Sequence, residues 1–276
     1  MSEVVARELV KTQLVVIRDV RCAGRCTDQS DEEATSATHI VFPYRGLYVR
    51  HLGHDDAVAE ANQAFFFNAH EGYRVTHPVP GGDASLDLVV NEQVLDELIP
   101  RGLRRAGHRV AFNQQRVRID PRAQALAALL RHSLQHEVAE TLEGETLALT
   151  LVKRALGPRT TRLPGATAGR QRLVNRIKLV LAGDVARRWT LAEIAAQVGH
   201  SPVYLTQVFQ EVEGVPLYRY HMRLRLARAL DLLSDYDDLT ALSLDLGFYS
   251  HSHFSTAFKQ AYGRPPSAFR SAALRR

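Results

Sequence analysis

The C-terminal part of the chain contains an internal repeat, and this repeat limits the folds open to it. Leu242, Leu246 and Gly247 lie 48 residues after Ile194, Val198 and Gly199. After one extra turn residue the offset becomes 49, and the pairs continue as Leu205 with Phe254, Phe209 with Phe258, Gln210 with Lys259, Gly214 with Gly263, and Pro216 with Pro265. We therefore expect two copies of one small helical unit.

Each copy has the start and stop signals of two short helices separated by a sharp turn. Thr190 with Glu193 three residues later forms a capping box that begins the first helix. Gly199 is suited to the left-handed turn that ends it, and Ser201 followed by Pro202 begins the second helix. This order predicts a helix-turn-helix unit. A long helix over residues 217–234 is expected to join the two copies.

The second helix of each copy presents unusual side chains on the face away from its own core. Phe254 and Phe258 fall on the core face of the later helix, whereas the outward residues are hydroxyls, amides, an imidazole and one methyl-bearing side chain. Such groups can hydrogen-bond base edges or touch a thymine methyl group in the major groove of DNA. Val203, Thr206, Gln207, His251, Ser252, Ser255 and Thr256 are among these outward residues.

The net positive charge of the chain arises in the same region. Residues 169–276 carry 15 Lys and Arg against 9 Asp and Glu, whereas the preceding 168 residues carry 20 against 21. A basic domain attached to a nearly neutral one favours a polyanionic partner for the basic part.

These motifs resemble the AraC-type (arabinose-regulator) family of transcription factors. The resemblance rests on "TLAEIAAQVGHSPVYLTQVFQ", "RLARALDLL" and "LGFYSHSHFSTAFKQAYGRPPSAFR", with Ser243 and Gln207 as departures from the usual pattern. It implies two recognition helices that enter successive major grooves, with half-sites centred roughly 10 base pairs, or about 34 Å, apart. By this resemblance, base reading is expected from Val203, Thr206, Gln207, His251, Ser252, Ser255 and Thr256. Contacts to the DNA backbone are then expected from Ser201, Gln210, Ser250, Lys259 and Arg264.

The N-terminal part has a different texture. Short runs rich in Val, Ile, Phe and Tyr, separated by turn residues, predict strands up to about Ile119. Asp120 and Pro121 then begin the first of two helices that end at Gly157. The apolar stripe of this helical hairpin would pack on the strands or on a second copy of the chain.

The resemblance extends to the order of these elements. It implies an α+β protein with a cupin-like β-barrel and helical hairpin over residues 1–156, a linker over 157–170, and an all-α domain with two helix-turn-helix units over 171–276. In such regulators the barrel binds an effector and the hairpin pairs two protomers. We therefore expect double-stranded DNA at promoters, a small-molecule effector and a homodimer through residues 121–156, with RNA polymerase as a candidate partner.

The chemistry of the effector site is less constrained. Aromatic residues make an organic ligand the default expectation, with a pocket formed by Phe42, Tyr44, Tyr48, Phe66 and Tyr73, although these side chains also suit a plain core. The histidines that invite a metal interpretation are His39, His51, His54, His70 and His77. Because His51 and His54 would point to opposite faces of a strand, we expect no metal and no cofactor. Cys22 and Cys26 are expected to be inert, and a thiol sensor or a soft-metal pair is the alternative.

Other functions find less support in the sequence. No apolar run approaches the ~18 residues of a membrane span, and two cysteines suit a reducing compartment, so we expect a cytoplasmic protein without a membrane partner. No catalytic motif indicates an enzyme. The alternatives are a cupin-type metal-dependent enzyme or a metal or thiol sensor that carries a DNA-binding module, and an architectural DNA binder without effector.

Overall fold

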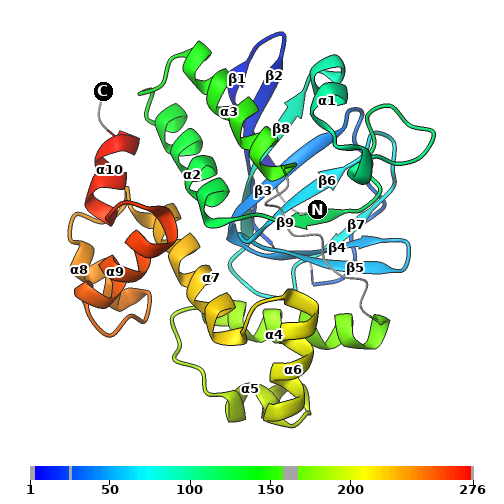
Figure 1. Cartoon of the computed structure of the whole chain (residues 1–276). Coiled ribbons are helices and arrows are strands. Elements are labelled where there is room, and N and C mark those ends of the chain that lie inside the picture. Colours follow the sequence, from blue (N-terminus) through cyan, green and yellow to red (C-terminus); the bar gives the residue numbers. More distant parts are fainter. Residues whose placement is uncertain (1–3, 25–26, 158–166, 275–276) are drawn as a thin grey trace.

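The N-terminal half consists of strands followed by helices (Figure 1). The structure is a computed structural model, and it describes residues 4–24, 27–157 and 167–274. The strands are β1 Val4–Lys11, β2 Val15–Cys22, β3 His39–Gly46, β4 Tyr48–Leu52, β5 Asp55–Ala59, β6 Gln63–Phe67, β7 Arg74–Thr76, β8 Asp83–Val90 and β9 Arg116–Arg118. The helices of this half are α1 Glu92–Leu98, a short 3-10 turn Arg101–Leu103, α2 Pro121–Gln135 and α3 Thr141–Ala155.

The strands form a larger sheet in the order β1-β2-β8-β3-β6-β9 and a smaller one in the order β5-β4-β7. Side chains of β3 alternate between two cores, as strand geometry requires. Ile40 and Phe42 pack toward helices α1–α3, whereas Val41 packs with Phe65 and Tyr48 between the sheets. The larger sheet therefore lies between a helical layer and the smaller sheet.

The predicted barrel is replaced by this two-sheet arrangement, since the described strands do not pair into a closed ring. The chain leaves the larger sheet at Gly46, which has φ +62°, and begins β4 two residues later. A Cβ atom at Gly46 would lie 1.9 Å from the carbonyl oxygen of Gly82. This glycine turn directs β4 into the smaller sheet. Strand β4 therefore does not pair with the larger sheet.

The helical hairpin packs within its own chain. Leu130, Leu134, Leu151 and Val152 are buried in the core under the larger sheet. Helix α2 also contacts α7, α9 and α10 of the C-terminal half. The apolar stripe that suggested a pairing surface thus covers the strands, which was one of the two alternatives.

The C-terminal half is helical throughout its described length. It comprises α4 Ala168–Gly183, α5 Leu191–Val198, α6 Pro202–Glu213, α7 Leu217–Leu232, α8 Leu239–Asp245, α9 His251–Tyr262 and α10 Pro266–Leu274. The first part of α7 packs with α4–α6 through Tyr220 and Leu224, and its last part packs with α8–α10 through Ala229 and Leu230. One helix therefore belongs to both units and fixes their separation.

These elements confirm the α+β class, with sheets in the N-terminal half and helices in the C-terminal half. The expected linker over 157–170 lies largely outside the described residues, and α4 already begins at Ala168, capped by Thr167. Strand β1 begins at Val4, and helix α1 was not predicted from the sequence. No described helix is long and apolar enough to cross a membrane.

Candidate nucleic-acid interface and effector cavity

The first helix-turn-helix unit is built from the predicted local signals. The side chain of Thr190 accepts a hydrogen bond from the Glu193 backbone, and Glu193 accepts one from the Thr190 backbone. The hydrogen bonds from Thr190 lower the pKa of Glu193 to about 2, so this carboxylate stays charged at the helix start. Gly199 ends α5 in the left-handed region at φ +70°, and Ser201 caps α6.

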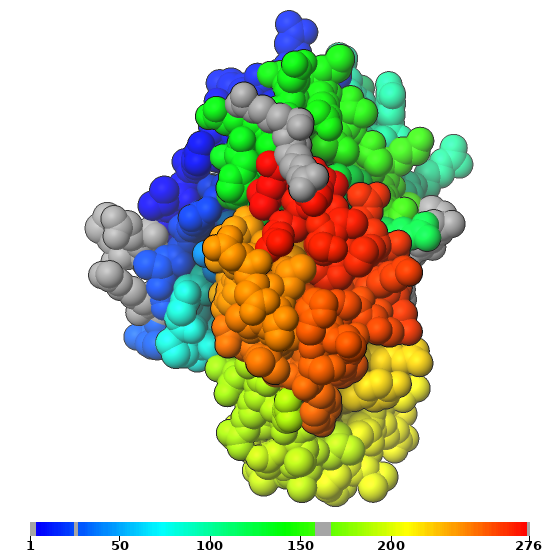
Figure 2. Space-filling model, turned by 90° about the vertical axis from the view of Figure 1, so that its left-hand side faces the viewer, coloured from blue at the N-terminus to red at the C-terminus, as the bar shows by residue number. Residues whose placement is uncertain are grey.

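The second unit repeats this construction. Asp238 caps α8, Gly247 takes φ +78° in the turn, and Ser250 caps α9. Gly214 and Gly263 end α6 and α9 in the same left-handed conformation, at φ +65° and +81°. The two units lie one above the other on one face of the molecule (Figure 2).

Most residues expected to read bases lie on the open faces of α6 and α9. Val203, Gln207, His251, Ser252 and Thr256 are exposed, whereas Thr206 and Ser255 are half-buried. Val203 is 77% exposed, which is unusual for a branched apolar side chain and favourable for contact with a thymine methyl group. Phe254 and Phe258 are fully buried, as predicted.

Local hydrogen bonds hold some of these side chains in place. The Thr206 hydroxyl donates to the carbonyl of Val203, and the Gln207 amide donates to Glu211. His251 and Ser255 lie within 3.3 Å of each other on α9. Each contact lies at the surface of its helix, where a contact to a base can replace it.

The residues expected at the DNA backbone divide into two kinds. The hydroxyls of Ser201 and Ser250 accept from backbone N–H groups and act as helix caps. Gln210, Lys259 and Arg264 are exposed, so their polar groups are accessible to phosphates.

The structure adds Arg188 as a candidate contact to the DNA backbone, which the sequence did not indicate. Arg188 lies over the Tyr249 ring at 4.0 Å and donates to the carbonyls of Gly247 and Phe248, in the turn before α9. Arg188 is exposed at the junction of the two units. No sequence pattern marks this position, because the contact joins residues about sixty positions apart.

Arg225 has a structural role on α7. Its guanidinium donates to the carbonyls of Val185, Ala186, Arg187 and Gly247. It therefore ties the loop before α5 to the turn of the second unit, and it holds the two units in one arrangement.

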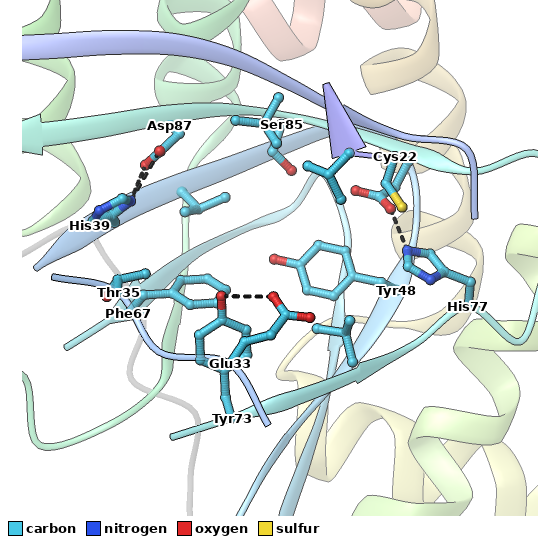
Figure 3. A pocket seen from close by; sticks show the side chains of 15 residues that line it. Cys22, Glu33, Thr35, His39, Tyr48, Phe67, Tyr73, His77, Ser85 and Asp87 are labelled. Atoms are coloured by element: carbon cyan, nitrogen blue, oxygen red, sulfur yellow. Dashed lines mark hydrogen bonds and ion pairs between the residues drawn. The ribbon is translucent and has the colours of Figure 1, made fainter. Parts of the chain in front are cut away.

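A cavity of about 240 Å³ lies between the two sheets of the N-terminal half (Figure 3). Tyr48 and Tyr73 line it, together with apolar groups such as Val41 and Phe67. Burial raises the pKa of both tyrosines, that of Tyr73 to about 12, so both hydroxyls remain protonated hydrogen-bond donors.

The other three residues expected in the effector pocket lie elsewhere. Phe66 stacks on Phe112 in the core, with ring centroids 3.8 Å apart. Phe42 and Tyr44 line a space of about 20 Å³ beside α2 and α7, and Tyr44 also lines a separate space of about 250 Å³ beside Gly46 and Arg228. Aromatic content alone did not separate core from cavity, because adjacent residues of one strand face opposite ways: Phe67 lines the cavity, whereas Phe66 packs in the core.

The histidines are spread over the N-terminal half. His39 pairs with Asp87 at 3.0 Å, and His77 pairs with Asp83 at 2.7 Å, both beside the cavity. His51 pairs with Asp56 on β4 and β5, away from His54 in the following turn. His70 has a left-handed backbone. His51 and His54 thus do not meet in a common site.

Buried charges join the N-terminal half to both helix-turn-helix units. Glu213 at the end of α6 accepts from Arg118 on β9 at 2.9 Å and from Lys178 on α4 at 2.8 Å. Burial raises the pKa of Glu213, but the two cations outweigh this effect and hold its pKa below the usual range.

A second buried group joins the N-terminal half to α7. Asp231 on α7 pairs with Arg45 on β3 at 2.8 Å and with Arg131 on α2 at 3.1 Å. His132, also on α2, donates to the carbonyl of Leu230 at 2.8 Å.

Comparison with known proteins bears on the C-terminal half. A family model described as a helix-turn-helix domain matches residues 194–272. An uncharacterized HTH-type transcriptional regulator, YidL of Escherichia coli (strain K12), is 31% identical over 99 residues, which are 36% of this chain and 33% of that protein. A putative AraC-like transcription regulator of Streptomyces lividans is 29% identical over 152 residues, which are 53% of this chain and 50% of the relative.

Among solved structures, an AraC-type DNA-binding domain-containing regulator from Chromobacterium violaceum is 26% identical. It aligns with 40% of this chain and 100% of its own, with a TM-score of 0.37. The chain spans about a third to a half of the length of the curated relatives. The matched residues include the turn glycines Gly199 and Gly247 and the caps Ser201 and Ser250. The C-terminal part of the chain is an AraC-type helix-turn-helix domain with two units on one linker helix.

Proposed function

We propose that the protein is a sequence-specific DNA-binding transcriptional regulator that responds to a small molecule in the cavity between its two sheets. The observation that carries the proposal is the pair of matched helices, α6 and α9, whose open faces bear Val203, Gln207, His251 and Thr256. The basic charge of the same domain supplies the attraction to phosphates.

The two helices have distinct groups for reading and for holding DNA. Residues 203, 206 and 207 of α6 and residues 251, 252, 255 and 256 of α9 contact base edges. Lys259, Arg264, Gln210 and the added Arg188 contact phosphates, and the caps at Ser201 and Ser250 direct helix N-termini toward the backbone. Because both α6 and α9 contact bases, the DNA site should consist of two half-sites.

The contacts between the two halves support regulation by an effector. His39 and Val41 of β3 line the cavity, and Arg45 on the same strand pairs with Asp231 of the linker helix. A ligand that shifts β3 would therefore alter the contacts that hold α7. Its effect on the free energy of DNA binding cannot exceed the difference between its binding free energies for the two positions of β3.

We also propose that the protein forms a homodimer, but through a different surface of the helical hairpin than its apolar stripe. The stripe of the hairpin is buried in the chain, but Leu142 on α3 is 73% exposed. A homodimer through residues 121–156 would use this outer side of α3. Sedimentation of the wild type and of Leu142→Asp tests it, because a dimer through α3 would dissociate in the variant.

The test of DNA recognition is fluorescence anisotropy with a selected duplex and a shuffled duplex of the same composition, at physiological salt. A regulator should bind the selected duplex at least about a thousandfold more tightly. Equal affinity for both duplexes would instead indicate an architectural binder.

A further inference from the structure

Three side chains of types that bind transition metals meet at one end of the cavity. The ligand atoms of Cys22, His77 and Asp83 all lie within 4.8 Å of one another. The His77 side chain is 3% exposed and that of Asp83 is 10% exposed. The close-up view shows Cys22 and His77 beside each other at the edge of the lined space (Figure 3).

The fold explains why these side chains converge. Cys22 ends β2 and Asp83 begins β8, and the two residues stand directly opposite each other in the antiparallel ladder. Cross-strand partners place their side chains on the same face of a sheet. His77 follows β7 in the smaller sheet, so it reaches the pair from the other side.

Backbone packing makes this end of the cavity a built site. Gly82 has φ +68°, and a Cβ atom there would lie 2.2 Å from the carbonyl oxygen of Cys22. The Gly24 backbone N–H donates to the Cys22 sulfur at 3.4 Å and so helps to fix the position of this side chain. The Tyr48 ring lies 6.3 Å from the His77 ring and forms the wall toward the cavity.

The geometry is close to what one ion requires. Atoms bound to Zn²⁺ at about 2.0–2.3 Å stand roughly 3.3–3.8 Å apart in a tetrahedron. The His77 Nε2 to Asp83 Oδ2 distance of 2.7 Å would have to open by roughly half an ångström. One sulfur, one nitrogen and one oxygen suit Zn²⁺ and neighbouring transition metals and disfavour Ca²⁺ and Mg²⁺, which prefer oxygen alone.

We propose that Cys22, His77 and Asp83 bind a divalent transition-metal ion of the Zn²⁺ class and leave its remaining position open to the cavity. The site is independent of the proposed DNA function, because it is formed entirely by the N-terminal half. An organic ligand with a carboxylate, thiol or imidazole could then complete the coordination from the cavity.

A second pair in the same cavity provides a matched control. His39 and Asp87 also form an ion pair, at 3.0 Å, on the neighbouring strands β3 and β8. Among the described residues, Cys22, His77 and Asp83 form a cluster of three potential metal ligands, and His39 and Asp87 do not belong to it. Substitution of His39 therefore changes the cavity without changing the proposed ligands.

The experiment titrates Co²⁺ into the reduced, chelator-treated full-length protein and records absorption. We expect saturation at one ion per chain, a thiolate-to-cobalt charge-transfer band and displacement by Zn²⁺. Cys22→Ser should abolish the band and weaken Zn²⁺ binding at least tenfold, whereas His39→Gln should leave both unchanged. Asp83→Asn should keep the band but weaken binding. Zn²⁺, but not Mg²⁺, should raise the melting temperature.

Three results would overturn the proposal: no saturable binding, a charge-transfer band that persists in Cys22→Ser, or equal losses in His39→Gln. Far-UV circular dichroism of the metal-free variants shows whether each has folded. If Cys22→Ser does not fold, Asp83→Asn decides, because unchanged affinity in that variant would contradict the assignment. DNA is absent throughout, so failure here leaves the regulator proposal standing.

Discussion

Glu213 is the buried anion that links the first helix-turn-helix unit to the N-terminal half, and its removal should be costly. Its side chain is 1% exposed and lies between Lys178 and Arg118, while Glu60 lies 3.9 Å from Lys178. The formal charges of the four groups sum to zero when all are ionised, although burial raises the pKa of Glu60. Glu213→Gln keeps the volume and leaves one uncompensated buried positive charge, so the free energy of unfolding should fall by about 3–5 kcal/mol.

The assay is urea denaturation of the full-length protein at pH 7, followed by circular dichroism. Glu211→Gln is the matched control, since Glu211 lies two residues earlier on α6 and pairs with Arg170 at 3.0 Å in an exposed position. Removing such a surface pair should cost less than about 1 kcal/mol. In Glu213→Gln, a second substitution Lys178→Met should recover part of the loss because it restores neutrality.

The pH dependence gives an independent check with a defined sign. Because the pKa of Glu213 is lower in the folded state, its contribution is fully present above the ordinary carboxyl pKa of 4.5 and is lost as pH falls through the lowered value. The wild type and Glu213→Gln should therefore converge in acid. A difference below about 0.5 kcal/mol at pH 7 would refute the view that Glu213 is a required buried counterion.

Three further results are expected. Lys259→Ala should weaken binding to all DNA sequences and should lower the slope of log affinity against log salt concentration by about 0.9 in an anisotropy titration. His251→Ala should instead relax the preference at one base position. An unchanged selected motif would contradict base reading by His251. Gly247→Ala should lower the free energy of unfolding by more than about 2 kcal/mol, because its Cβ would meet a carbonyl oxygen at 1.9 Å, whereas Gly199→Ala, with open space around it, should lose only about 1 kcal/mol. Burial lowers the pKa of His132 from 6.5 to about 4, so the free energy of unfolding should fall by about 3 kcal/mol as pH drops through that range. Denaturation curves of His132→Gln at pH 7 and pH 4 should lack this contribution to the pH dependence.

Local signals made the C-terminal domain predictable from the sequence. The capping box at Thr190, the left-handed glycine at Gly199 and the cap at Ser201 each act over three or four residues, and the structure has all three. The repeat then supplied the second unit. The outward positions of α6 and α9 followed from helical spacing alone.

Contacts between distant residues could not be predicted in the same way. The pairing of Asp231 with Arg45 and Arg131 depends on how α7 docks against β3 and α2, and no periodicity encodes that docking. Likewise, the meeting of Cys22 with Asp83 depends on the register of β2 with β8. The histidines invited a metal interpretation, but the packing of the smaller sheet on the larger one decides that His77 lies beside Cys22.

The central claim is that both α6 and α9 read base sequence. The most direct test is selection of bound duplexes from a randomised pool by the full-length protein at physiological salt. The account predicts a motif with two half-sites centred roughly 10 base pairs apart. A motif with a single half-site, or a bound pool without enrichment, would contradict it.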